Sequence, residues 1–241
     1  MSELLVDQYA RLLDALPLEA PWSKLIDSGF LDLMVPENEG GGGASLTEVF
    51  DIAFETGRRP SAPPIIETMI ARLFRRDALA VTNLEEFSGR ALSAACVSAL
   101  MSGAMAEIQA MTIEYATTRK QFGREIGRFQ AVQQQLAIMA EEVGAARMAA
   151  QLAFSGLPED VSETRAGIAK YRCSQAARQV TSIAHAVHGA MGISGECQLH
   201  YFTRKLRMWC FLHGGESWWA ERLGEAAFAS KEELTTVARL I

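Results

Sequence analysis

One stretch of the chain combines cations, glycine and a helix end in a way that suits a bound phosphate. Tyr115-Ala116-Thr117-Thr118-Arg119-Lys120-Gln121-Phe122-Gly123 ends one predicted helix and opens a short loop, and another helix begins at Phe129-Gln130. Four cations and one carboxylate lie between Arg119 and Arg128. A guanidinium group forms paired, charge-assisted hydrogen bonds to phosphate. The same residues also fit a basic helix C-terminus that satisfies its own carbonyl groups, and the sequence leaves both interpretations open.

A second constellation lies nearer the C-terminus. The segment Ala186-Val187-His188-Gly189-Ala190-Met191-Gly192-Ile193 ends a predicted helix, and its two glycines allow tight backbone geometry or the close approach of a ligand. Further on, His213-Gly214-Gly215-Glu216-Ser217 is a loop that feeds a helix, where exposed backbone N–H groups suit an anion. His185 and His188 are three residues apart, but no third ligand is evident, so we expect no metal site. A helix C-cap with histidine near the last carbonyls is the alternative.

The composition indicates a packed globular protein. Its 241 residues are 49% hydrophobic, enough for one large core or two smaller ones. The net charge of -6 argues against nucleic acid as the main partner, so the cations at 119–128 form a local feature of an acidic protein. Four cysteines without CxxC spacing indicate buried free thiols in a reducing compartment: Cys96, Cys173, Cys197 and Cys210.

Two observations argue against a membrane. The N-terminus lacks a basic start followed by an apolar run, and the longest uncharged run, Ala91 to Ala106, is too short to span a bilayer. Small residues dominate that run, which favours a close-packed core helix. We therefore expect a cytoplasmic protein without a membrane partner.

Helix signals occur along almost the whole chain, and no sustained alternation rich in Val, Ile and Thr predicts a strand. A capping box, Ser45-Leu46-Thr47-Glu48, opens one helix, and the longest helices are expected over 89–118, 129–154, 162–187 and 216–240. Residues 81–88 are the one plausible linker, which divides an N-terminal helical domain (1–83) from a C-terminal domain (84–241). We predict an all-α fold whose second half is an up-down four-helix bundle.

The two constellations, in this order and at this separation, resemble the acyl-CoA dehydrogenase family. Arg119 to Gly123 followed by Phe129-Gln130-Ala131-Val132-Gln133 is similar to the family's motif after the first helix of its C-terminal bundle. Val187 to Gly192 resembles its Gly-Gly-x-Gly turn. Gly29-Phe30 to Val35-Pro36-Glu37, with Gly40 to Gly43 and Leu46, resembles its N-terminal helical domain, so the resemblance covers nearly the whole chain.

The resemblance implies an FAD site shared across a subunit interface. In the family, the first motif reaches the neighbouring subunit and holds the pyrophosphate and adenosine end of its flavin. Carried over, Arg119 and Gln121 would contact phosphate or ribose, Phe122 would pack beside the cofactor, and Gln130 would hydrogen-bond to it. Gly189 and Ala190 would let the backbone approach, whereas Ala186 replaces a glutamine that is common in the family.

Two departures from the family pattern concern the chemistry. The family's middle β-domain has no counterpart, because residues 81–88 join the helical domains almost directly. The family usually supplies a glutamate base in a Tyr-Glu-Gly-Thr-like motif, and here Leu212-His213-Gly214-Gly215 stands in that place. The other family position for the base falls near Ser93, where no acidic residue lies between Arg90 and Glu107. Both positions therefore lack the carboxylate.

His213 is the candidate replacement for the missing base. The unperturbed pKa of histidine, about 6.5, suits general-base chemistry, and Glu216 is placed one helical turn further on, where it could pair with the imidazole. Gly214 would then lie against the substrate. The alternative is a pseudo-active site in which His213 and Glu216 cap the next helix.

Three functional hypotheses follow. The first is a base-lacking subunit that supports the flavin site of an FAD-dependent acyl-CoA dehydrogenase complex, as a homo-oligomer or as a heteromer with a full-length subunit. The second is a helical scaffold without flavin, and the third is an enzyme that acts on an acyl-CoA with His213 as base. Under each of them we expect an oligomer, and the candidate interface residues are Ala91 to Ala106, Trp209, Trp218 and Trp219, with ordinary core as the alternative for the tryptophans.

Overall fold

The computed structural model describes residues 2–17, 21–74, 90–155 and 161–229, and nearly all of them are helical or lie in short connections. The N-terminal part contains α1 (Ser2–Asp14), α2 (Pro21–Asp27), the 3-10 turns η1 (Phe30–Asp32) and η2 (Glu37–Glu39), α3 (Leu46–Gly57) and α4 (Ile65–Phe74). The C-terminal part contains α5 (Arg90–Thr118), β1 (Lys120–Gln121), β2 (Arg124–Glu125), η3 (Ile126–Arg128), α6 (Gln130–Ala153), α7 (Glu163–His188), η4 (Gly189–Ile193), α8 (Leu199–Phe211) and α9 (Glu216–Ala229).

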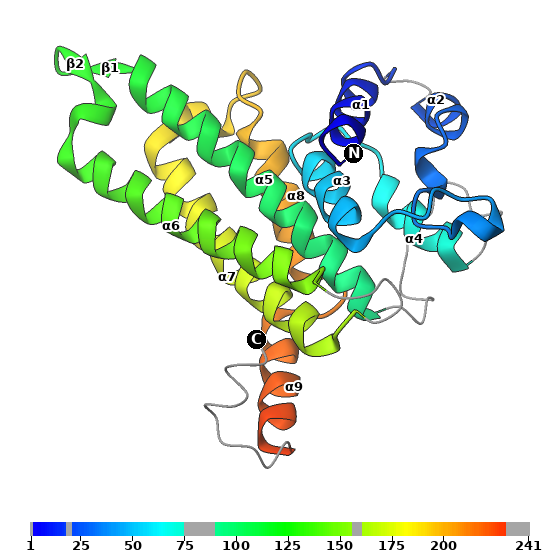
Figure 1. Ribbon diagram of the computed structural model, residues 1–241. Coiled ribbons are helices and arrows are strands. Elements are labelled where there is room, and N and C mark those ends of the chain that lie inside the picture. The colour runs from blue at the N-terminus through cyan, green and yellow to red at the C-terminus, as the bar shows by residue number, and fades with distance from the viewer. Residues whose placement is uncertain (1, 18–20, 75–89, 156–160, 230–241) are drawn as a thin grey trace.

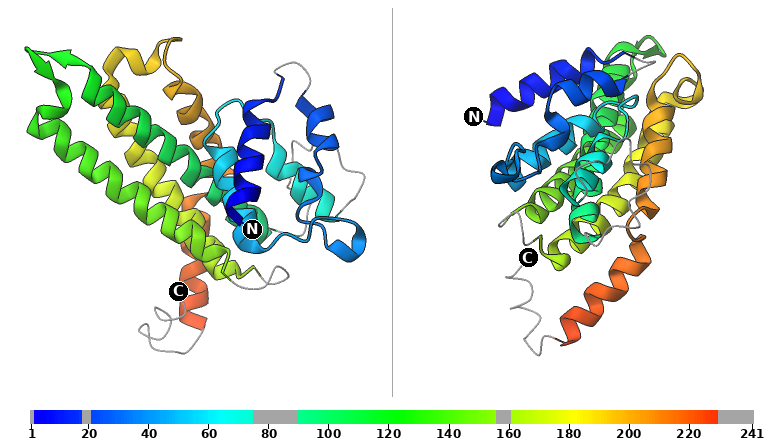
Figure 2. Two further views of the ribbon diagram at one scale, coloured as in Figure 1. Left: turned by 45° about the horizontal axis from the view of Figure 1, so that its top comes forward. Right: turned by 90° about the vertical axis from the view of Figure 1, so that its right-hand side faces the viewer.

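The architecture confirms the predicted all-α fold. Helices α5, α6, α7 and α8 run up and down as a bundle, and the N-terminal helices pack beside α5 (Figures 1 and 2). The described residues contain no barrel-like middle domain, since their strands are the two short ones of the β1–β2 hairpin. The predicted linker at 81–88, and with it the boundary between 1–83 and 84–241, lies outside the described residues.

Helix α5 forms the centre of the core. Every residue from Leu92 to Met105 is buried, and the hydroxyl groups of Ser98 and Ser102 donate to carbonyl oxygens of their own helix. The proposal that Ala91 to Ala106 forms an exposed interface is therefore wrong, because this run packs inside the protein itself. Of the described helices, α5 alone has the length and apolarity to cross a membrane, yet 83% of its qualifying window is buried within the protein.

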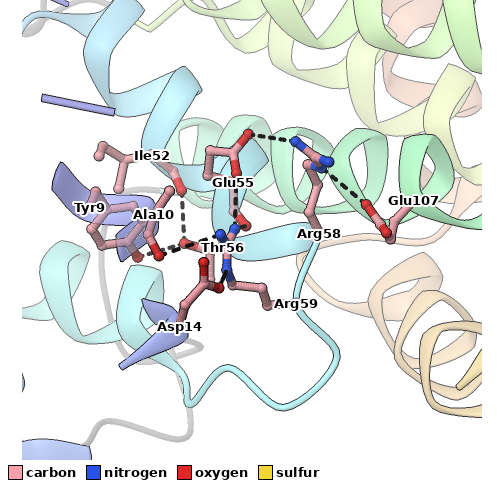
Figure 3. A network of polar contacts seen from close by, with 9 residues as sticks. All are labelled: Tyr9, Ala10, Asp14, Ile52, Glu55, Thr56, Arg58, Arg59 and Glu107. Atoms are coloured by element: carbon pink, nitrogen blue, oxygen red, sulfur yellow. Dashed lines mark hydrogen bonds and ion pairs between the residues drawn. The ribbon is translucent and has the colours of Figure 1, made fainter. Parts of the chain in front are cut away.

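The N-terminal helices are joined to the bundle by a close backbone contact between α3 and α5. A Cβ atom on Gly103 would lie 2.0 Å from the carbonyl oxygen of Phe54, and one on Gly57 would lie 2.1 Å from that of Leu100. Both glycines are therefore needed for the helices to approach at this distance. Beside this contact, Arg58, which follows α3, forms an ion pair of 3.1 Å with Glu107 of α5 (Figure 3).

A polar network stabilises the N-terminal helices themselves. Tyr9 of α1 and Thr56 of α3 share a buried hydrogen bond of 2.6 Å, and Arg59 pairs with Asp14 and Glu55 (Figure 3). Burial raises the pKa of Tyr9 far above its ordinary value, so its phenol stays protonated. These contacts fix α1 against α3 and hence against the bundle.

Local signals account for several helix ends. The predicted capping box at Ser45 is confirmed, because its side chain accepts from the Glu48 N–H while Glu48 accepts from the Ser45 N–H. Ser162 caps α7 by accepting from the Arg165 N–H. Gly167 lies within α7, where a Cβ would lie 2.5 Å from the Trp219 ring, so this glycine makes room for α9.

Candidate functional site

The cation-rich stretch forms a tight hairpin at one end of the bundle (Figure 1). Lys120 pairs with Glu125 and Gln121 with Arg124 across the two strands. The turn residues, Phe122 and Gly123, have φ values of 52° and 78°. Two successive residues with positive φ define the type I′ turn, whose twist matches that of a two-residue hairpin.

Three of the four hairpin cations are engaged locally. Glu125 accepts from Arg128 at 2.6 Å and lies 4.0 Å from Lys120, and the Arg124 guanidinium lies 4.2 Å from the centre of the Phe129 ring. The Arg119 side chain is exposed and makes no hydrogen bond or ion pair with any other described residue. Arg119 is thus the hairpin cation that remains available to an external anion.

The helix-capping alternative for Arg119 is wrong. The hydroxyl groups of Thr117 and Thr118 donate to carbonyl oxygens at the end of α5, including those of Ile113, Glu114 and Tyr115. Threonines rather than the arginine side chain therefore satisfy this helix end.

Phe122 occupies the tip of the hairpin in an unusual state. Its side chain is 92% exposed and its backbone is left-handed, a conformation that bulky residues rarely adopt. Its contact with the Phe129 ring is edge-on, with 6.1 Å between the centroids. A large apolar side chain presented in this way suits a docking contact.

The structure brings the first part of the second constellation, Ala186 to Ile193, to the same end of the bundle. His188, the last residue of α7, stacks on Tyr115 of α5 with 4.5 Å between ring centroids, and its Nδ1 lies 2.9 Å from the Ala184 carbonyl oxygen. Gly189 follows with φ 57° and ψ -138°, a conformation that favours glycine, and both Gly189 and Ala190 are exposed. Tyr115 precedes Arg119 by one helical turn, so the two predicted cofactor-binding segments are neighbours in space.

The groove beside this stack does not suit a phosphate. It has a volume of about 500 Å³, is open to solvent, and is lined by Glu107, Glu114 and Glu196 together with Tyr115 and His188. The three carboxylates would repel an anion bound in this groove. An anionic ligand at this end of the bundle would therefore lie at Arg119, with the exposed amides of Gln121 and Gln130 nearby in the chain.

His213 lies at the opposite end of the bundle. Arg90, the first residue of α5, stacks over the Trp218 ring of α9 at 5.0 Å, next to the His213 loop, whereas Tyr115 is near the last residue of α5. The 25 positions between Arg90 and Tyr115 correspond to about 37 Å of helix. Within one copy, the candidate base and the candidate cofactor residues therefore cannot act on the same atoms.

The surroundings of His213 make it a poor base. Burial, followed by the positive charges of Lys170 and Arg90, lowers its pKa to about 4. Its Nε2 atom is buried without a hydrogen-bond partner among the described residues, and Glu216 pairs with Arg178 of α7 instead of with the imidazole. The expected pairing of Glu216 with His213 is therefore wrong, and a histidine with this pKa is mismatched to proton abstraction near neutral pH.

The lowered pKa of His213 predicts a loss of stability in acid. Between pH 6.5 and pH 4 the unfolded chain binds a proton at this histidine and the folded chain does not, so the free energy of unfolding falls as the pH falls. The loss should reach about 1–2 kcal/mol once the partial exposure of the ring is taken into account. Asparagine tolerates the φ of 57°, so His213→Asn should remove this acid-dependent loss without straining the backbone. Urea unfolding at several pH values measures it. The same dependence of unfolding free energy on pH in wild type and variant would contradict the prediction.

A buried lysine is the residue at this end that the sequence did not reveal. Lys170 of α7 is fully buried and donates hydrogen bonds to the carbonyl oxygens of Cys210 and Gly214, at 2.9 and 3.1 Å. Trp219 donates to the carbonyl oxygen of His213 at 3.1 Å, so two donors hold this loop. The sequence does contain a signal for this buried cation. Lys170 lies one helical turn from Ala166 and from Ser174, on a helix face of small residues where a charged side chain is unusual.

Comparisons with known proteins place this geometry in a family. A family model described as the C-terminal domain of acyl-CoA dehydrogenase matches residues 89–227. The chain is 35% identical over 127 residues to acyl-CoA dehydrogenase IpdE2 of Mycolicibacterium smegmatis, covering 52% of this chain and 40% of that protein. It is 36% identical over 104 residues to 3-sulfinopropanoyl-CoA desulfinase of Paraburkholderia xenovorans, covering 43% of this chain and 27% of the relative. The chain belongs to the acyl-CoA dehydrogenase family.

A solved structure shares almost the whole fold. The ChsE4-ChsE5 complex from Mycobacterium tuberculosis contains a chain that superimposes with a TM-score of 0.81 at 19% identity, covering 96% of this chain and 98% of that one. This likeness confirms the fold. By contrast, the chain spans well under half the length of the two curated relatives, whose names indicate different reactions.

The residues at the hairpin end fit half of a flavin site. Arg119 supplies a free guanidinium group, Gln121 and Gln130 supply exposed amides, Phe122 an exposed ring, and Gly189 with Ala190 an open backbone. All these groups are exposed in a single copy of the chain. Among the described residues, no group of three or more His, Cys, Asp or Glu side chains is arranged to hold a metal ion.

Proposed function

We propose that this chain is a subunit of an FAD-dependent acyl-CoA dehydrogenase complex, in which it supports the flavin site of a full-length partner subunit and does not supply the catalytic base. When bound, FAD would accept the hydride in the α,β-dehydrogenation of an acyl-CoA thioester. The role of this chain is to bind and orient the phosphate end of the cofactor through Arg119, Gln121 and Gln130, with Phe122 packed beside it.

The free guanidinium group of Arg119 is the observation that carries the proposal. Glu125 and Phe129 engage the other cations of the hairpin, and threonines satisfy the helix end. A charged, exposed side chain that no local contact needs is available for a ligand, and arginine matches phosphate oxygens in pairs. The lack of a carboxylate at either family position and the low pKa of His213 support the base-lacking part of the proposal.

The Arg119→Ala variant, co-expressed with a full-length acyl-CoA dehydrogenase subunit that forms a complex with the wild type, should retain less flavin. Loss of a charge-assisted contact to phosphate is expected to weaken retention by about tenfold or more. The measurement is the ratio of flavin absorbance to protein in the purified complex. A pull-down shows in parallel whether the complex still forms. Arg119→Lys should restore only part of the flavin retention, because lysine keeps the positive charge and loses the paired hydrogen-bond geometry.

Lys120→Ala provides the matched control on the same hairpin. It removes the same charge from a residue that already lies beside Glu125, so it should change flavin retention much less. Equal retention in wild type and Arg119→Ala would contradict the proposed role of the hairpin. A complex that forms yet stays colourless would favour the scaffold hypothesis, and activity of the isolated chain that His213→Ala abolishes would favour the enzyme hypothesis.

A further inference from the structure

Helices α7 and α8 enclose a groove of about 470 Å³ that the proposed function does not use. Its buried residues, which include Ser174 and Ala177 of α7 and Leu206 of α8, form the floor. The exposed side chains of Arg207 and Phe211 lie at the rim. Positions three and four residues apart share one face of a helix, so each helix contributes a continuous wall. A volume of this size is in the range of pockets that bind small organic molecules.

The groove exists because its floor is built from small side chains. Ser174 and Ala177 leave the space between the two helix backbones that a larger residue would fill, and Leu206 and Phe211 add apolar surface on the other side. Phe211 is 77% exposed in the single chain. Exposed apolar surface of this kind is unfavourable in water, and a ligand with an apolar body would cover it.

Arg207 gives the groove an unbalanced positive charge. Its exposed guanidinium group has no hydrogen-bonded or ion-paired partner among the described residues. The other cation of the lining, Arg178, is paired with Glu216. Within α7 the one acidic residue is Glu163, which pairs with Arg222, and α8 contains none. The groove is thus cationic in a chain whose net charge is -6.

The size of that charge limits the ligand to a single negative charge. His185 lies near Arg207 and could add a second cation, but burial, followed by the charges of His188 and Arg207, lowers its pKa. Its imidazole is therefore neutral near pH 7, and its Nε2 lies 3.4 Å from the hydroxyl oxygen of Thr203 in the lining. One free guanidinium group matches a monoanion better than a doubly charged phosphate.

We propose that this groove binds a small monocarboxylate with an aliphatic body, whose chain lies on the floor between α7 and α8 and whose carboxylate pairs with Arg207. A guanidinium group donates two parallel hydrogen bonds to a carboxylate, which fixes the head of the ligand. The aliphatic stem of the arginine extends the apolar wall up to that head. Glu216 does not oppose the carboxylate, because Arg178 neutralises it.

This site goes beyond the proposed function and uses other residues. Among the described residues, those that line the groove include neither His213 nor Gly214, which stand where the family places its base and substrate. They also include no residue of the hairpin that carries Arg119. Ligand binding in the groove therefore does not require the flavin.

Isothermal titration calorimetry on the purified full-length chain without flavin tests the proposal, with decanoate below its micelle concentration as the probe. Hexanoate should bind at least about tenfold more weakly, because each buried methylene contributes up to about fourfold in affinity. Decanol, which keeps the apolar body and lacks the charge, should bind about tenfold more weakly than decanoate.

Two arginine variants locate the carboxylate. Arg207→Ala should weaken decanoate binding by about tenfold and leave decanol binding unchanged, so that the preference for decanoate disappears. Arg204→Ala is the matched control, since it removes the same exposed charge from α8 at a position that does not line the groove. It should leave both affinities as in the wild type. Neither substitution removes a contact that the described part of the chain needs for folding.

Two half-buried cysteines locate the aliphatic body. Cys210 lines this groove, whereas Cys197 lines the groove beside the Tyr115 and His188 stack and serves as an internal control. Saturating decanoate should slow alkylation of Cys210 by iodoacetamide about fivefold or more and leave Cys197 unchanged, as measured by mass spectrometry of the digested chain.

Several results would overturn the proposal. They are the absence of decanoate binding, equal affinity for decanoate and decanol, an equal loss in Arg204→Ala and Arg207→Ala, and alkylation of Cys210 that decanoate does not slow. Because no flavin is present in these measurements, their outcome is independent of the Arg119 experiment.

Discussion

Replacing Gly103 with alanine should destabilise the protein by about 2–4 kcal/mol, despite the better helix propensity of alanine. The added Cβ would lie 2.0 Å from the carbonyl oxygen of Phe54, far inside van der Waals contact. Because the obstacle is backbone, a side-chain rotation cannot relieve it, and α3 has to move away from α5. That movement weakens the contact that joins the N-terminal helices to the bundle. The measurement is urea unfolding followed by circular dichroism.

Gly144 supplies the control for this substitution. It lies inside α6 and a Cβ there would meet no atom within 4 Å, so Gly144→Ala should stabilise the protein by about 0.5–1 kcal/mol through helix propensity alone. If Gly103→Ala lowers the free energy of unfolding and Gly144→Ala raises it, the loss at Gly103 is caused by packing and not by helix propensity. A Gly103→Ala protein as stable as wild type would show that α3 and α5 adjust without cost.

The fold was predictable because helical signals are local. The capping residues Ser45 and Ser162 and the stretch from Leu92 to Met105 indicate helices by composition and spacing alone. What the small residues of α5 pack against was not predictable in the same way. Gly103 meets Phe54, which is 49 positions earlier in the chain, and such a contact depends on the tertiary arrangement rather than on any local pattern.

The candidate site was predictable in part for the same reason. The sequence placed a phosphate-suited cation cluster at 119–128, but four cations share that stretch, and only the contacts of Glu125 and Phe129 show that Arg119 is free. At the other end, spacing suggested that Glu216 would pair with His213. Arg178 of α7, 38 positions before Glu216, forms that ion pair instead, and no property of the local sequence indicates it.

Removing the Lys170 ammonium group should have an effect comparable to that of Gly103→Ala. Its hydrogen bonds to the Cys210 and Gly214 carbonyl oxygens join α7 to the loop between α8 and α9. Lys170→Met is close in volume and cannot donate, so both acceptors lose a buried partner, at a cost of about 2–4 kcal/mol in the free energy of unfolding. Urea unfolding near neutral pH measures this loss.

The pH dependence of that loss distinguishes Lys170 from an ordinary packing residue. Burial lowers its pKa from 10.5 to about 8. Between these values the unfolded chain holds a proton that the folded chain releases, so the stability of the wild type gains up to about 3 kcal/mol from this group as the pH rises from 8 to 10.5. Burial raises the pKa values of the neighbouring thiols of Cys173 and Cys210, so the folded chain keeps protons there that the unfolded chain releases, and these groups oppose the gain in wild type and variant alike.

Lys170→Met should therefore lose this alkaline gain, and the difference in stability between wild type and variant should widen from pH 8 to pH 10.5. Lys24→Met, which removes a lysine whose amine bonds the exposed Ala15 carbonyl, should follow the wild-type curve. A constant difference across this range would mean that Lys170 keeps an ordinary pKa despite its burial. In that case water must reach the loop at 212–215, and the low pKa of His213, which depends on the same burial, should be lost as well.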